Sequence, residues 1–319
     1  YALTAVGEQI TRSVFGSGAV IAFGKRLFIL LAVAHIFGLS DIDTSIMLTG
    51  GILALVLITA GLLSSVGHLA SPKNAWRAFF RFRTSWLSRE GVFAVAFYPV
   101  AMLYLLGFWL GDGESGGLVV MLGLASIVIA LATVFSTGMI YGCLKTIRQW
   151  NTALTPANFI LLGLATGGVL LTMVLAFHGK EVVAMAGLSA GLLTLAAVTK
   201  AIYYFWMRTV TGPTINTATG FTRAKVRLLD TGHTAGTFLT EEFGYQANGS
   251  LIAMLKTAVF ALGLIIPLLA MITVANGVGG AFLAVVAALF ALVGVGAERW
   301  LFFAEARHVV NLYHGAQHT

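Results

Sequence analysis

The chain has 319 residues, of which 58% are hydrophobic and only 10% are charged, and its mean hydropathy is +0.92. Soluble domains carry about 25% charged residues, so this composition excludes a soluble enzyme. The single cysteine, Cys143, excludes a disulfide framework and a cysteine-ligated zinc or iron–sulfur site within the chain. The sequence therefore predicts an all-α integral membrane protein, and any iron–sulfur cluster that works with it must belong to a partner.

About eight transmembrane helices are expected, packed as a bundle in a single membrane domain over residues 1–319. The first must lie within residues 14–39, where Lys25 and Arg26 interrupt the apolar run. The other runs reach about the 20 residues that cross a bilayer. They cover residues 46–69, 91–111, 118–141, 158–177, 182–206, 251–274 and 280–303.

Basic residues follow a strict alternation between the connections. The connections after the second, fourth and sixth spans hold Lys73, Arg77, Arg81, Arg83, Arg89, Lys145, Arg148, Arg208, Arg223, Lys225 and Arg227. The opposite connections hold Lys180 as their only basic residue, beside several acids. Because positive connections stay in the cytoplasm, both termini are expected there, in a multi-pass bacterial inner-membrane protein. Orientation also accounts for the net charge of +7, so we expect no nucleic-acid partner.

Two of the inner segments are longer than a simple connection needs. Residues 70–90 are basic and aromatic, which is typical of an interfacial amphipathic helix and equally of a docking surface for a peripheral subunit. In the docking hypothesis Arg77, Arg81 and Arg83 contact the partner. Residues 207–250 form a long polar inner loop, and loops of this length are usually functional, ordered by a partner or disordered.

Ionisable residues at the membrane edge are candidates for chemistry. His68 ends the second span and Glu90 begins the third. If these ends converge, an imidazole and a carboxylate could relay the two protons that accompany two-electron reduction of a quinone. The structural alternative is that His68 caps a helix or bonds a carbonyl group, while Glu90 pairs with Arg89 or Arg77.

A second group of charges lies at the end of the last span. Glu298 and Glu305 are seven residues apart and share a helix face, and Glu305 can meet His308 three residues later. Glu298 and Arg299 lie deep enough to need partners, such as Lys200 or Lys256. An intramembrane salt bridge and a proton path are both open interpretations.

The histidines leave one haem hypothesis open. A membrane haem needs two facing histidines at similar depth, and the candidates near spans are His35, His68, His178 and His308. His178 belongs to the outer side and His68 to the inner side, so only His68 with His308 is conceivable. No metal site is otherwise expected in this protein.

Several segments resemble the membrane-anchor subunits of dimethyl sulfoxide reductases. They read GLLSSVGHLASPKNAWRAFFRFRTSWLSREG, IYGCLKTIRQWNTALTPANFILLG, ATGFTRAKVRLLDTGHTAGTFLTEEFG and ERWLFFAEARHVVNLYHG. The resemblance covers most of the chain from about residue 50, whereas the region before residue 46 departs from the family pattern. It implies eight helices, no haem, and an iron–sulfur partner subunit that contacts a molybdopterin-bearing catalytic subunit.

The resemblance also assigns roles. The quinol-site histidine of the family falls on His68, in HLASP, and its carboxylate before the third span falls on Glu90. We add Trp86, Arg89 and Ser71 to this quinone-site hypothesis. SWLSREG and the long inner loop look more like the relatives that oxidise sulfite and reduce quinone, and docking on the basic loops would place the soluble subunits in the cytoplasm.

The leading hypothesis is therefore a quinone-reactive anchor of a respiratory molybdenum–iron–sulfur oxidoreductase, which catalyses no substrate reaction alone and contains no proton pump. Its quinone would be ubiquinone or menaquinone. The alternatives are a sulfoxide-type reductase anchor that oxidises quinol, a haem b subunit, and a secondary transporter. A transporter predicts inverted repeats, and we find no convincing repeat.

Overall fold

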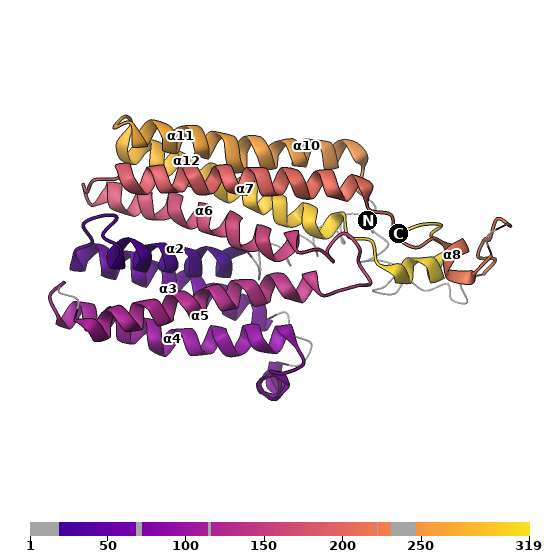
Figure 1. Ribbon diagram of the computed structural model, residues 1–319, viewed down its shortest axis with the longest axis horizontal. Coiled ribbons are helices and arrows are strands. Elements are labelled where there is room, and N and C mark those ends of the chain that lie inside the picture. Colours follow the sequence, from indigo (N-terminus) through magenta and orange to yellow (C-terminus); the bar gives the residue numbers. More distant parts are fainter. Residues whose placement is uncertain (1–18, 68–71, 114–115, 222, 231–246) are drawn as a thin grey trace.

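The computed structural model describes residues 19–67, 72–113, 116–221, 223–230 and 247–319, and these form a bundle of long helices (Figure 1). Seven helices are long and apolar enough to cross a membrane. They are α3 (Thr44–Gly67), α4 (Trp86–Leu110), α5 (Gly117–Gly142), α6 (Leu154–Phe177), α7 (Val183–Thr209), the continuous run of α10 (Gly249–Phe260), η3 (Ala261–Ile265) and α11 (Ile266–Ala275), and α12 (Gly280–Ala304). All seven uninterrupted spans are confirmed as helices.

The expected first span corresponds to α2 (Ala19–Ile36), which lies inside the bundle but is not among the seven candidate spans. Lys25 and Arg26 are both about 1% exposed, and Leu27 and Phe28 beside them are fully buried. The helix packs against α3, α5 and α6. The two charges therefore do not break the helix but point into the protein.

Helix α4 begins five residues before the predicted start of its span. Ser85 caps it, because the Ser85 hydroxyl accepts a hydrogen bond from the Ser88 amide at 3.4 Å. This earlier start includes Trp86 and Glu90 in the first turns of the helix. Both side chains are thereby held on a rigid element.

The span from α10 to α11 contains a π-helical turn that the sequence pattern did not predict. Pro267 follows this turn and has no N–H to donate to the preceding turn, while the amide of Ile266 bonds the Ala261 carbonyl. Gly263 in the turn packs against Gly294 of α12, where any Cβ would collide with the Gly263 backbone. Small residues here let the two helices touch through their backbones.

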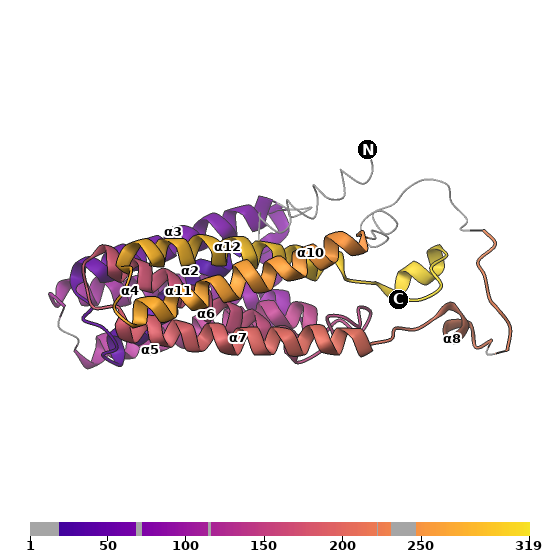
Figure 2. The same ribbon diagram turned by 90° about the horizontal axis from the view of Figure 1, so that it is seen from above.

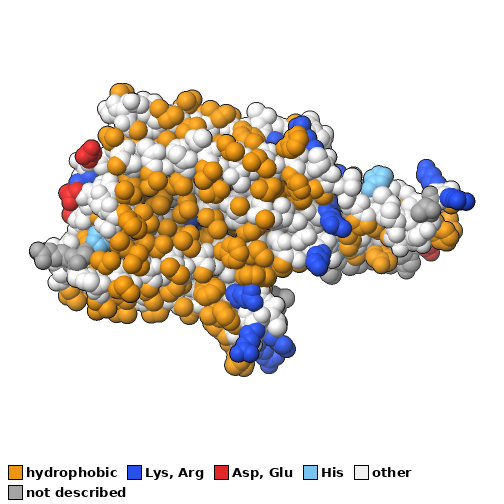
Figure 3. All heavy atoms as spheres, viewed as in Figure 1, with side chains coloured by type: hydrophobic (Ala, Val, Ile, Leu, Met, Phe, Trp, Pro, Cys, Tyr) orange, Lys and Arg blue, Asp and Glu red, His pale blue; other side chains and the backbone are white. Residues whose placement is uncertain are grey.

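Charge divides the molecule into two ends (Figure 3). At one end Lys180 pairs with Asp41 at 2.7 Å and with Asp43 at 3.1 Å. The other end carries the basic connections, together with the short helices η2 (Pro72–Arg81), α8 (Ile215–Thr219) and η4 (Val309–His314). We call these the acidic end and the basic end.

The long inner loop is partly ordered against the C-terminal residues. The Ile215 amide donates to the Gln317 carbonyl at 3.1 Å, and the Thr319 hydroxyl donates to the Pro213 carbonyl at 3.2 Å. Figure 2 shows α8 and the C-terminal segment projecting beyond the ends of the spans. The predicted 207–250 loop is shorter than expected, because α7 continues to Thr209 and α10 begins at Gly249. Its described residues between 210 and 230 lie outside the bundle.

Candidate functional site

The predicted His68–Glu90 pair can be placed only in part. Helix α3 ends at Gly67, so His68 follows directly, but His68 and Ser71 lie outside the described residues. Helices α3 and α4 pack against each other, and η2 contacts both. Glu90 belongs to the second turn of α4 at the basic end.

Glu90 contacts other helices rather than its arginine neighbours. The Thr137 hydroxyl of α5 donates to Glu90 Oε1 at 2.6 Å, and buried Lys25 of α2 interacts electrostatically with the carboxylate. The Arg89 side chain instead donates to the carbonyls of Phe82 at 3.0 Å and Arg83 at 2.8 Å. Among the described residues, Glu90 forms no ion pair with either Arg89 or Arg77, which were the alternative partners.

Trp86 lies one turn before Glu90 on the same face of α4. The Arg89 guanidinium covers its ring at 4.2 Å from the centroid, and the Phe135 ring meets it edge-on at 5.8 Å. Phe135 also borders a groove of about 620 Å³ between the basic-end parts of α5 and α6. The groove is lined by Phe135, Met139, Gly142, Asn151, Thr152, Ala153, Pro156, Ala157 and Ile160. An apolar groove of this size can hold the ring of a lipid-soluble molecule.

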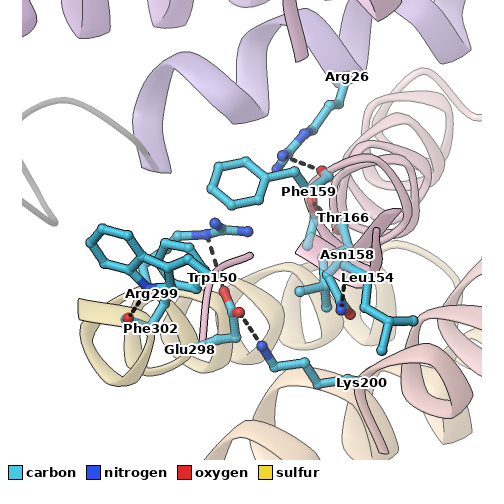
Figure 4. Close-up of polar contacts among 11 residues, drawn as sticks. Arg26, Trp150, Leu154, Asn158, Phe159, Thr166, Lys200, Glu298, Arg299 and Phe302 are labelled. Carbon is cyan, nitrogen blue, oxygen red and sulfur yellow. Dashed lines mark hydrogen bonds and ion pairs between the residues drawn. The ribbon is translucent and has the colours of Figure 1, made fainter. Parts of the chain in front are cut away.

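A second buried cluster joins α7 and α12 (Figure 4). The Lys200 ammonium forms an ion pair with Glu298 Oε1, and Arg299 Nε lies 3.0 Å from Glu298 Oε2. All three residues are at most 5% exposed. Nearer the basic end, Lys256 pairs with Glu305 at 2.6 Å. The prediction that these acids have lysine partners is confirmed.

Glu305 and His308 do not share a helix face, because α12 ends at Ala304 and Glu305 is its C-terminal cap. His308 instead begins η4, where its Nδ1 accepts the Val310 amide at 3.0 Å. Partial burial lowers the pKa of His308. Two other histidines near spans also have partners: His35 bonds the Tyr104 hydroxyl at 2.6 Å, and His178 bonds the Val174 carbonyl at 2.9 Å.

Tyr141 connects the two clusters. It lies within electrostatic range of both Glu90 and Arg299, and its ring stacks on Phe159 at 5.7 Å. Arg299 in turn covers the Phe159 ring at 3.7 Å, and Arg26 donates to the Phe159 carbonyl at 2.5 Å. Sequence reasoning missed Lys25 and Arg26 as parts of these clusters, although charges within an apolar helix usually face the bundle interior.

The other predicted positions are simpler. Arg77, Arg81 and Arg83 are exposed on or just after η2, together with Trp76 and Phe80. Figure 1 views η2, the purple coil at the bottom of the picture, along its axis while the spans run across the page. Among the described residues, no three His, Cys, Asp or Glu side chains form a group that could hold a metal ion.

Comparison with known proteins decides the family. The family model described as DMSO reductase anchor subunit (DmsC) matches residues 11–304. The chain belongs to this family. It is 34% identical over 276 residues to the C subunit of sulfite dehydrogenase from Allochromatium vinosum, an alignment that covers 83% of this sequence and 85% of that protein. It is also 28% identical over 153 residues to the C polypeptide of polysulfide reductase from Wolinella succinogenes, covering 43% of this sequence and 48% of the relative.

The anchor family confirms the resemblance found in the sequence and makes the protein a membrane subunit of an oxidoreductase complex. The family match begins at residue 11, so it also includes α2, where the sequence pattern departed from the one expected of the family.

Proposed function

We propose that this anchor passes electrons between an iron–sulfur partner subunit and membrane quinone, within a complex that oxidises sulfite and reduces quinone. The direction of the reaction is supported by the similarity to the C subunit of sulfite dehydrogenase over most of both proteins. The iron–sulfur clusters and the molybdopterin would belong to the partner subunits, because the single cysteine cannot ligate a cluster.

The observation that carries the quinone proposal is the environment of Glu90. Its carboxylate is held by Thr137 and lies in the field of Lys25, at the basic-end edge of the bundle. Trp86 on the same helix face leads to the apolar groove beside Phe135. A positioned acid next to a space for an apolar ring fits the requirements of a quinone site.

The proposed site residues supply the protons for quinone reduction and line the quinone site. Reduction of quinone to quinol takes two electrons and two protons, and the electrons come from the partner. His68, which directly follows α3 in the sequence, and Glu90, in the second turn of α4, would deliver the protons from water at the basic end. Trp86, Arg89 and Ser71 would line the site. Proton uptake and cluster oxidation on the same side imply no proton pump.

Docking would use the basic end. Arg77, Arg81 and Arg83 are exposed beside the start of α4, so a partner bound there would bring its terminal cluster close to the quinone site. Positive connections favour the cytoplasm, which would put the soluble subunits and both termini on the cytoplasmic side of a bacterial inner membrane.

The decisive experiment uses the purified complex with His68→Ala and Glu90→Gln. We expect sulfite-driven quinone reduction to fall in both variants by roughly a hundredfold or more, while iron–sulfur EPR signals and bound partners are retained. Matched controls are His178→Ala and Glu181→Gln near the acidic end, which should turn over normally. Normal turnover in both site variants, or a bis-histidine haem spectrum, would reject the proposal.

The similarity to the C polypeptide of polysulfide reductase supports a second direction, in which quinol is oxidised and a sulfur compound is reduced. It covers less than half of either protein, so we rank it second. Assaying the same complex with sulfite plus quinone, and separately with polysulfide or sulfoxide plus quinol, distinguishes the two directions.

A further inference from the structure

Arg26 and Arg299 carry more positive charge than their surroundings balance. They interact electrostatically with each other and with Glu298, and Glu298 also pairs with Lys200. Three buried cations thus share one buried carboxylate. Two further acids lie nearby. Glu305 pairs with Lys256 and also acts on Lys200, whereas Glu90 faces Lys25. Neither acid is among the groups that act on Arg26.

A neutral lysine does not remove this excess. A guanidinium group stays charged in proteins, so Arg26 and Arg299 would still face one carboxylate if Lys200 lost its proton. Unpaired charges are costly away from water. The described residues therefore lack one negative charge near Arg26 and Arg299.

The hydrogen-bonding groups lead to the same conclusion. Arg26 Nε and Nη1 and Arg299 Nη1 and Nη2 are buried and have no acceptor among the residues that the structure describes. Arg26 is about 1% exposed and Arg299 about 5%. Figure 4 shows the two side chains reaching the region of Phe159 from α2 and α12. Several unused donors of like charge thus gather around one aromatic ring.

We propose that Arg26 and Arg299 bind a small inorganic anion, of the size of chloride, where α2, α6 and α12 meet. Guanidinium N–H groups are strong donors to anions, and a single negative charge would neutralise the excess. Arg299 lies five residues before the end of α12, so the site is about 8 Å along the helix from the basic end. The positive residues at that end would concentrate anions near it.

The site would act as a structural counter-ion for α2. This helix brings Lys25 to Glu90 and Arg26 to α6, so its position affects both clusters. An anion between α2 and α12 would hold these helices together without requiring a further acidic residue.

The test measures the thermal stability of the whole purified complex in sodium chloride and in sodium gluconate at equal ionic strength. We expect the Tm to rise with chloride and to saturate, because the anion binds the folded state. In Arg299→Gln the half-saturating chloride concentration should rise about tenfold or more. Arg148→Gln, an exposed arginine at the same end, is the matched control and should keep the wild-type dependence.

Bromide gives an independent measurement in the wild-type complex, in case Arg299→Gln does not assemble. Anomalous diffraction should then show a peak between the two guanidinium groups. A Tm that is equal in chloride and gluconate, an equal change in Arg148→Gln, or bromide data without this peak would each overturn the proposal.

Discussion

Two acids towards the basic end, Glu90 of α4 and Glu298 of α12, differ in burial and in how completely they are paired. Glu298 is about 1% exposed and has both Lys200 and Arg299 as salt-bridge partners. Glu90 is only half-buried, accepts one hydrogen bond from Thr137, and has no salt bridge within 4.0 Å among the described residues. An acid held by two cations is suited to fixing helix packing, whereas one held by a hydroxyl group can exchange a proton.

The largest expected effect is on Glu298. Glu298→Gln would remove the carboxylate that Lys200, Arg26 and Arg299 share, which should destabilise the anchor by about 3–5 kcal/mol. The measurement is the Tm of the purified complex and its content of each subunit. Glu305→Gln is the control, because Glu305 and Lys256 are more exposed. Equal stability of both variants would contradict the structural role of Glu298.

The double variant Lys200→Met with Glu298→Gln sharpens this result. Because it removes both partners of the ion pair, it should lose less stability than the sum of the two single changes. Quinone turnover at permissive temperature should remain in the double variant. Loss of turnover in an intact, stable complex would instead favour the proton-path interpretation of this cluster.

Glu90→Gln should show the opposite pattern. We expect a fall in quinone turnover of roughly a hundredfold or more, with a stability loss of only about 1 kcal/mol. Turnover and Tm measured on the same preparation test this contrast. If Glu90→Gln lowered the Tm as much as Glu298→Gln does, both acids would have the same structural role.

Thr137→Val tests the hydroxyl that holds Glu90. Loss of this bond should cost about 1 kcal/mol of stability and lower turnover by about tenfold or less. The effect on turnover is smaller than that of Glu90→Gln because the carboxyl group remains. Thr133→Val, one turn earlier on α5, is the matched control, since its hydroxyl bonds the Ile129 carbonyl. The two variants should differ in turnover and not in stability.

The smallest effect is expected at the acidic end. The Ile46 amide, which donates to Asp43 at 2.9 Å, together with Lys180, lowers the pKa of Asp43. The stability that the ionised Asp43 carboxylate gives the folded protein is present above the unfolded pKa of about 3.9. It is lost as the pH falls below that value. Asp43→Asn should therefore lower the Tm slightly at pH 7 and should have a smaller effect near pH 3. An equal loss at both pH values would contradict this assignment.

The apolar spans could be predicted because hydropathy alone determines them, as for α5 and α6. The position of α2 was harder to predict, since Lys25 and Arg26 interrupt its pattern and only the tertiary structure shows that they face inward. The π-helical turn before Pro267 could not be predicted, because it depends on contact between Gly263 and Gly294.

The site was predictable to the extent that residue type and position along a span reveal it. Glu90, Glu298 and Glu305 are acids at the ends of apolar runs, so each was a candidate. Their partners were harder to predict from the sequence, since Thr137 is 47 residues from Glu90 and Lys200 is 98 residues from Glu298. Such pairs depend on which helices are neighbours. The helical spacing expected between Glu305 and His308 is absent, because α12 ends at Ala304.

The inward charges of α2 have a consequence for biogenesis. Each lysine or arginine at the centre of a helix costs about 2.5–3.5 kcal/mol during insertion by the translocon. Insertion of α2 by itself is therefore unfavourable. The acceptor for Arg26 is the carbonyl of Phe159, 133 residues later in the sequence, and Glu298 is made later still. The contacts that accommodate Arg26 in the bundle can therefore form only after Phe159 has been synthesised, and its balance with Glu298 only after most of α12 has been made.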